Sequence, residues 1–80
     1  MYYTYILRLA NNSYYIGCTS DLEKRLDYHK KSKVFSTKNK LPLTLIYFEK
    51  KNSLSEARIR EMQIKKWKSR EAIERLLKKG

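Results

Sequence analysis

Residues 11–29, "NNSYYIGCTSDLEKRLDYH", decide the fold because they change from the alternation of a strand to the period of a helix. The opening "NNS" (11–13) predicts a hairpin turn, since asparagine tolerates the positive φ that such turns demand. "YYIGC" (14–18) continues as a strand, and "TSDLEKRLDYHKK" (19–31) follows a helical period. A hairpin that runs directly into a helix is therefore the first predicted unit.

The remaining elements extend this unit on both sides. "YYTYILRL" (2–9) predicts a strand antiparallel to 14–18, with both faces partly covered. "LTLIYFE" (43–49) is apolar on both faces and predicts a third strand that is central or covered. Helices are expected at 52–67 and 69–79. The order ββαβαα indicates the α+β class, with a three-stranded antiparallel sheet flanked by helices, as one domain over all 80 residues.

Three serines mark where the helices should begin. Ser20 with Glu23, and Ser53 with Glu56, have the S-x-x-E spacing of a capping box, in which each side chain binds a free backbone N–H. Ser69 is a single N-cap residue before the last helix.

Charge is the strongest signal in the composition. Nineteen Lys and Arg against eight Asp and Glu give a net charge of +11, which favours a polyanionic partner. Nucleic acid, with DNA first, is the expected partner, and the seven tyrosines would suit base stacking. A membrane surface is not expected, because no segment is a basic amphipathic helix with a wide apolar face. A basic protein-interaction scaffold remains an alternative, and the sequence leaves the oligomeric state open.

Cysteine usage and the N-terminus predict the compartment. Cys18 is the only cysteine, so neither a disulfide partner nor a Cys/His zinc pattern is expected. "MYYTYILRLA" (1–10) is too short and too polar for a signal peptide or a membrane span. A cytoplasmic protein is the expectation.

Glu61 does not fit the packing pattern of its helix. Leu54, Ala57 and Ile64 lie seven and four residues before it and three after it, which places the carboxylate in the apolar stripe. A buried carboxylate must be paired, protonated or bound to a metal. A salt bridge to one of the many Lys or Arg residues and a metal or catalytic role are both open.

Arg25 and His29 repeat this pattern in the first helix, where they share the stripe of Leu22 and Leu26. Arg25 could snorkel from the edge of the stripe, and His29 could be a hydrogen-bonded, half-buried ring. Gly17 inside a strand costs stability and predicts a bulge or a close approach to its backbone. An acid, a cation and an imidazole together also suggest a site.

These residues resemble the GIY-YIG nuclease domain, the fold of the N-terminal nuclease of the excinuclease C subunit. The likeness is greatest to small single-domain bacterial members of the family, and it covers nearly the whole chain. The residues that carry it are Tyr3-Thr4-Tyr5, Tyr15-Ile16-Gly17, Arg25, His29 and Glu61. "YTY" stands where the family name has "GIY", and no asparagine follows Glu61 in "MQIKKWKSREAIE" (62–74).

The resemblance implies metal-dependent hydrolysis of phosphodiester bonds in DNA, in a setting such as DNA repair. One divalent ion, Mg²⁺ or else Mn²⁺, would be held by Glu61 and would polarise the phosphate. Arg25 would bind a phosphate oxygen, and His29 would hydrogen-bond a tyrosine or the water. Tyr5 or Tyr15 would accept the proton of the attacking water. The alternative is a nucleic-acid-binding module that kept the fold and has weak activity or none.

Ordinary pKa values favour a different base. Tyrosine titrates near pH 10 and histidine near 6.5, so His29 would be the better proton acceptor unless a metal and Arg25 lower a tyrosine's pKa. The resemblance favours a tyrosine, and the residues alone favour His29.

The hairpin register tests the site. A two-residue loop, Asn11-Asn12, would pair Leu9 with Tyr14 and turn Tyr5 and Tyr15 to opposite faces. A three-residue loop, 11–13, would pair Leu9 with Tyr15 and place both tyrosines on one face. We expect the second register, or a bulge with the same effect.

Basic side chains in two regions are candidates for contacts with the nucleic-acid backbone. One region is the loop at 32–42, which Pro42 ends, and the other is the long helix. The candidates are Lys31, Lys33, Lys38, Lys40, Lys65, Lys66 and Lys68.

Overall fold

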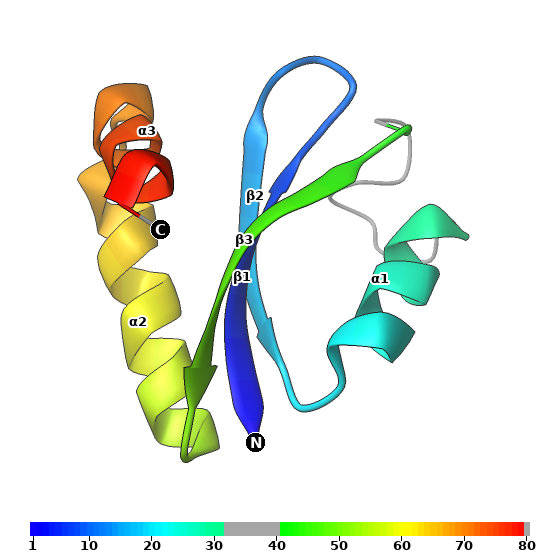
Figure 1. Cartoon of the computed structure of the whole chain (residues 1–80), viewed down its shortest axis with the longest axis vertical. Coiled ribbons are helices and arrows are strands. Elements are labelled where there is room, and N and C mark those ends of the chain that lie inside the picture. The colour runs from blue at the N-terminus through cyan, green and yellow to red at the C-terminus, as the bar shows by residue number, and fades with distance from the viewer. Residues whose placement is uncertain (32–40, 80) are drawn as a thin grey trace.

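The computed structural model of the chain describes residues 1–31 and 41–79 (Figure 1). Its elements follow the predicted order ββαβαα. They are β1 Tyr2–Arg8, β2 Tyr14–Thr19, α1 Leu22–Lys30, β3 Thr44–Lys51, α2 Leu54–Trp67 and α3 Arg70–Lys79.

The sheet is antiparallel with strand order β2-β1-β3, and helices cover both of its faces. In Figure 1, α1 lies on one side of the sheet and α2 and α3 lie on the other. On the α1 face, Tyr5 and Leu7 pack with Leu26. On the opposite face, Ile6 packs with Ile64. Further side chains from both the sheet and the helices complete that core.

β3 is an outer strand whose two faces both pack against helices, so of the two predicted alternatives "central" is wrong and "covered" is confirmed. β1 is central, and its residues 4–7 are all buried. β3 is apolar on both sides because helices cover both faces of the sheet, and that property does not reveal the order of the strands. A register shift at Ile46 turns both Ile46 and Tyr47 toward the α2/α3 core, while Leu45 faces α1.

The hairpin has a three-residue loop, one residue earlier than predicted. Leu9 N–H donates to Ser13 O and Asn12 N–H donates to Leu9 O, both at 2.9 Å, so the loop is residues 10–12. Asn12 has φ 66°, the left-handed conformation that closes such loops. The predicted pair of Leu9 with Tyr15 is wrong, and Tyr15 lies opposite Leu7. The observed pairing differs from the predicted pairing by two residues. Each side chain therefore keeps its predicted face of the sheet.

Two of the three predicted N-cap residues, Ser53 and Ser69, cap their helices. Ser53 Oγ accepts from Glu56 N at 3.2 Å, and Ser69 Oγ accepts from Ala72 N at 3.3 Å. α1 is capped by Asp21 instead of Ser20: its carboxylate accepts from Lys24 N at 3.1 Å. The backbone N–H of Asp21 donates to Thr19 Oγ1, and this turn delays the helix by one residue.

Thr4 holds α2 on the sheet, although the sequence did not single it out. Its hydroxyl donates to the carbonyl of Ala57 at 2.8 Å, and both residues are fully buried. Glu61 lies one helical turn further along α2. This bond, together with the packing of Ile64, therefore positions Glu61 relative to the sheet.

Replacing Thr4 by Val should lower the free energy of unfolding by about 1 kcal/mol, because the isosteric side chain loses a buried hydrogen bond. Urea denaturation measures this loss. Thr4→Ser is the control, since it keeps the hydroxyl and loses only a methyl group. A Val variant as stable as the wild type would show that the bond does not hold the helix.

Candidate active site

Two tyrosines from neighbouring strands share the α1 face, as predicted. Tyr5 lies opposite Gly17, and Tyr15 lies opposite Leu7, two residues along. The two phenol rings are 6.3 Å apart. Tyr5 is fully buried, whereas Tyr15 remains partly exposed.

Helix α1 adds Arg25 and His29 to the tyrosines. The two are four residues apart and so lie on one side of the helix. Arg25 Nε–H donates to the Tyr5 hydroxyl at 3.4 Å, and His29 Nε2 lies 3.0 Å from the same oxygen. The His29 ring also meets the Tyr15 ring edge-on, with centroids 5.0 Å apart. We call these four residues the phenol cluster. His29 is wholly buried, beyond the half-buried ring that the sequence suggested.

Arg25 and His29 both bond the Tyr5 hydroxyl. The guanidinium of Arg25 can only donate, so the Tyr5 oxygen accepts from it. The Tyr5 O–H donates to Nε2 of a neutral His29 in the tautomer that carries its proton on Nδ1. Burial, and then the charge of Arg25, lower the pKa of His29 to about 4, so the ring is neutral at pH 7. Burial raises the pKa of Tyr5 to about 12, against the opposing effect of Arg25.

Gly17 is required by the ring of Tyr5. A Cβ at this position would lie 2.6 Å from the Tyr5 hydroxyl oxygen and 2.7 Å from Cζ. Its φ is not positive, and β1 and β2 pair without a break around it. Of the two predicted explanations for this glycine, the close approach is confirmed and the bulge is wrong.

Comparisons with known proteins now decide the family. The profile described as "GIY-YIG catalytic domain" matches residues 1–75. The chain belongs to the GIY-YIG family. Membership indicates a nuclease-type domain whose substrate is nucleic acid.

The relatives are UPF0213 proteins. A UPF0213 protein of Syntrophus aciditrophicus is 38% identical over 74 residues, covering 90% of this chain and 85% of its own length. The UPF0213 protein SH2523 of Staphylococcus haemolyticus is 40% identical over 65 residues, with 80% and 79% covered. The solution NMR structure of the UPF0213 protein BH0048 of Bacillus halodurans has a TM-score of 0.61 at 31% identity, covering 98% of this chain and 84% of that one.

Glu61 approaches β2 from the opposite face to the phenol cluster. Its carboxylate pairs with Lys65 Nζ at 2.5 Å, and its side chain is 18% exposed. It therefore lies at the margin of the apolar stripe, where Ala57 and Ile64 are buried. Glu61 interacts with Cys18 on β2: burial, and then a hydrogen bond with Glu61, raise the pKa of this thiol. Cys18 follows Gly17 directly on β2, an outer strand, so Glu61 and the phenol cluster flank the same strand.

The predicted contact lysines divide into three groups. Lys31 pairs with Asp27 at 2.9 Å, and Lys65 pairs with Glu61. Lys66 and Lys68 are exposed at the end of α2. The candidates Lys33, Lys38 and Lys40 lie outside the described residues.

A second charged centre, which the sequence did not reveal, lies on the α2 side of β3. Glu49 accepts from Arg60 at 3.0–3.2 Å and from the Tyr47 hydroxyl, and it pairs with Lys51 at 3.1 Å. Burial disfavours the charged carboxylate, but these bonds outweigh it and hold the pKa of Glu49 below its ordinary value.

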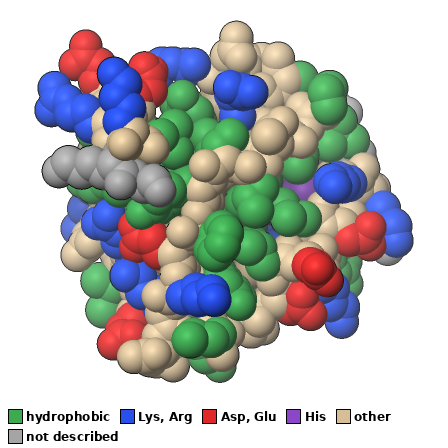
Figure 2. All heavy atoms as spheres, in the orientation of Figure 1, with side chains coloured by type: hydrophobic (Ala, Val, Ile, Leu, Met, Phe, Trp, Pro, Cys, Tyr) green, Lys and Arg blue, Asp and Glu red, His purple; other side chains and the backbone are tan. Residues whose placement is uncertain are grey.

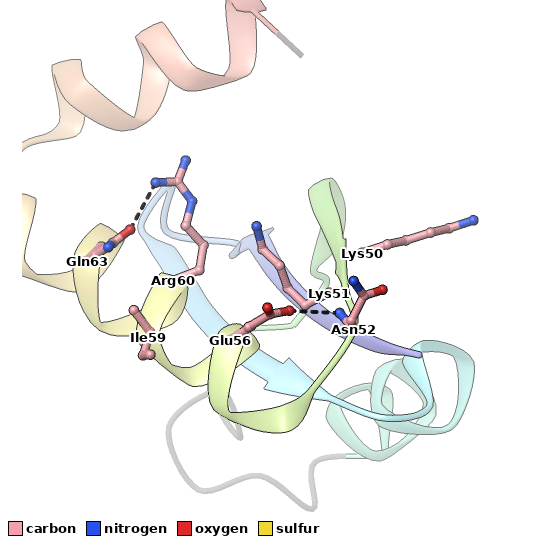
Figure 3. Close-up of a pocket in the computed structure, with 7 residues that line it drawn as sticks. All are labelled: Lys50, Lys51, Asn52, Glu56, Ile59, Arg60 and Gln63. Carbon is pink, nitrogen blue, oxygen red and sulfur yellow. Dashed lines mark hydrogen bonds between the residues drawn. The ribbon is translucent and has the colours of Figure 1, made fainter.

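This centre borders a hollow of about 460 Å³ at the start of α2 (Figure 3). Two of its basic side chains, Arg60 and Lys51, share the single carboxylate of Glu49, and Arg60 also bonds Gln63. The hollow is thus part of the packing between β3 and α2, on the other face from the phenol cluster.

Two structural limits complete the description. Within residues 1–31 and 41–79, no three His, Cys, Asp or Glu side chains come close enough together to hold a metal ion. Among the same residues, every helix is too short or too polar to cross a membrane.

Gly17→Ala should destabilise the protein by about 1–3 kcal/mol, the usual cost of forcing extra volume into a packed site. The new methyl group meets the Tyr5 ring at 2.7 Å and must displace it from His29. Thermal unfolding measures the loss, and the same Gly17→Ala change should cost less when it is made in a Tyr5→Leu background. Equal costs in the two backgrounds would mean that the ring is not the obstacle.

The stability of the protein should fall as the pH drops from about 6.5 to about 4, because the unfolded chain binds a proton at His29 that the folded chain excludes. Above pH 6.5 this contribution is constant. The slope is up to about 1.4 kcal/mol per pH unit. Denaturant titrations between pH 6.5 and 5, where few carboxylates titrate, should show this slope in the wild type and a flatter one in His29→Gln. Identical slopes would contradict the assignment.

Proposed function

We propose that this domain is a metal-dependent endonuclease that hydrolyses phosphodiester bonds in DNA. The observation that supports it best is the phenol cluster: Arg25 and His29 both bond the hydroxyl of a buried tyrosine beside a second, accessible tyrosine. A packed core has no need of this arrangement, and the cluster lies on a domain of the GIY-YIG family with a net charge of +11.

Burial separates the roles of the two tyrosines. Tyr5 is fully buried and has a raised pKa, so it is a poor proton acceptor for water. We assign it to orientation, because it fixes Arg25 and His29 in one network. Tyr15 is partly exposed beside them, and we assign it as the group that takes the proton from the attacking water. His29 is also buried, with a pKa of about 4, which argues against it as the direct base.

Arg25 is the residue proposed to bind the phosphate. Its Nε–H points to Tyr5 and a hydrogen bond to Tyr15 also acts on it, while the planar group has five N–H donors in all and so can still donate to a phosphate oxygen. Its interactions with Tyr5 raise the pKa of Arg25, so it stays charged throughout.

Glu61 is the residue proposed to hold the divalent ion. Mg²⁺ commonly takes one or two protein carboxylates and completes its shell with water and phosphate oxygens, so a single partly exposed carboxylate fits it. The half-exposed side chain of Lys65 would have to move aside. When bound, the ion would stabilise negative charge on the phosphate.

The same ion pair supports a second function, a nucleic-acid-binding module without chemistry. Lys65 neutralises Glu61 without any metal, so the carboxylate is compatible with a purely structural role. Exposed cations such as Lys66 and Lys68 would then bind phosphates by counterion release, each contributing about −0.9 to the log–log salt slope on duplex DNA.

Cleavage of labelled duplex, single-stranded and branched DNA, with Mg²⁺ or with chelator, separates the two functions. The nuclease proposal predicts metal-dependent products, lost by at least about a hundredfold in Glu61→Gln and Tyr15→Phe. Glu71→Gln, which removes an exposed carboxylate on α3, is the matched control and should retain activity. Binding without metal-dependent cleavage of any substrate would leave only the binding module.

A further inference from the structure

A hollow of about 390 Å³ adjoins the phenol cluster on the α1 face of the sheet. Its floor comes from β1 and β3, and its wall is the first turn of α1. The Cα partner of Tyr5 on β3 is Phe48, and that of Tyr3 is Lys50. The row of residues that holds Gly17 and Tyr5 thus continues directly into the hollow at Phe48.

Two aromatic rings form the floor. Tyr3 and Phe48 meet edge to face, with centroids 5.9 Å apart and planes at 66°. Phe48 is 45% exposed, a high value for a phenylalanine on a strand. In Figure 2, hydrophobic side chains gather over β3 in the middle of the visible face, with charged groups mainly around them. An exposed aromatic surface of this kind on a basic protein is a platform on which a nucleobase can stack.

Charged side chains of both signs border the two aromatic rings. Glu23 and Asp21 contribute carboxylates from the start of α1, and Lys50 contributes an ammonium from β3. Asp21 already accepts from the backbone of Lys24, whereas Glu23 extends from an exposed position. Carboxylates repel phosphate but accept hydrogen bonds from the exocyclic amino group of a base. Lys50 is exposed and suits the phosphate.

We infer that this hollow binds an unpaired, amino-bearing nucleobase of a nucleic-acid strand. The base stacks on Phe48 and Tyr3, its amino group bonds Glu23, and its phosphate lies at Lys50. The ligand class rests on the proposed function. Because Phe48 neighbours Tyr5 across the sheet, the bound nucleotide lies beside the phosphate that Arg25 holds. The preferred substrate then has a single-stranded or frayed segment next to the cleavage position.

Binding in chelator tests the inference without any chemistry. Fluorescence anisotropy with labelled dC and dT oligonucleotides of equal length should show tighter binding of dC, which carries the amino group. Phe48→Ala should weaken dC binding about five- to a hundredfold, the range found for loss of one stacked base. Phe48→Trp should retain binding. The matched control is Ile59→Ala, which removes an exposed apolar side chain on the opposite face.

The carboxylate is tested separately. Glu23→Gln should reduce the preference for dC over dT, because an amide also donates to the thymine carbonyl. Free dCMP should compete only weakly, since it lacks the rest of the strand. If it competes as well as the oligonucleotide, the hollow is a site for free nucleotides and the inference is wrong. Equal binding of dC and dT by the wild type, or no greater effect of Phe48→Ala than of Ile59→Ala, would also overturn it.

The cleavage assay, run on the same variants, keeps the two proposals apart. Wild type that cleaves DNA while Phe48→Ala binds dC normally would reject the hollow and retain the nuclease. Wild type that binds dC through Phe48 but cleaves nothing would retain the hollow and reject the nuclease. Thermal unfolding of each variant establishes that the fold is intact.

Discussion

The contact between the Tyr5 ring and the bare backbone of Gly17 is the constraint on which the candidate site depends. The ring occupies the volume that the Cβ of any other residue at position 17 would need. It places a phenol hydroxyl in a buried region, where desolvation would be costly without partners. Arg25 and His29 supply those partners from the next helix. One residue type at position 17 thus determines where the tyrosine lies, and the tyrosine determines what α1 must present to it.

The two faces of the sheet have different tasks. The face toward α2 and α3 is mainly aliphatic around Ile6, Ile16, Ile64 and Ile73, and it supplies a large part of the core. The face toward α1 carries the phenol cluster, Phe48 in the same row as Tyr5, and Tyr3 two residues along β1. β2 contributes side chains to both faces, because consecutive residues of a strand point to opposite sides. Gly17 faces the phenols and Cys18 faces Glu61. The two halves of the proposed site therefore lie on opposite faces of the same outer strand.

Electrostatics divides the cations of the described chain into those already paired and those available. Glu49 forms ion pairs with Arg60 and Lys51, and Glu61 forms one with Lys65. Arg70 stacks over Tyr14 and bonds the carbonyl of Asn12, which joins α3 to the hairpin. Lys50, Lys66 and Lys68 remain exposed at the surface. A net charge of +11 therefore overstates the number of side chains with which the folded protein could meet phosphate.

The amino-acid pattern by itself determined the order of the elements, two of the three helix caps, the shared face of Tyr5 and Tyr15, and the grouping of Arg25 with His29. These follow from local periodicity and parity, which act over a few residues. Only the tertiary structure decided that β1 is central, that Asp21 caps α1, and that Glu49 is the partly buried acid of a charged cluster. It also decided that Tyr5 is the buried phenol and that its ring is the reason for Gly17. Such facts depend on which distant segments meet, and burial and hydrogen-bond partners are set by those meetings.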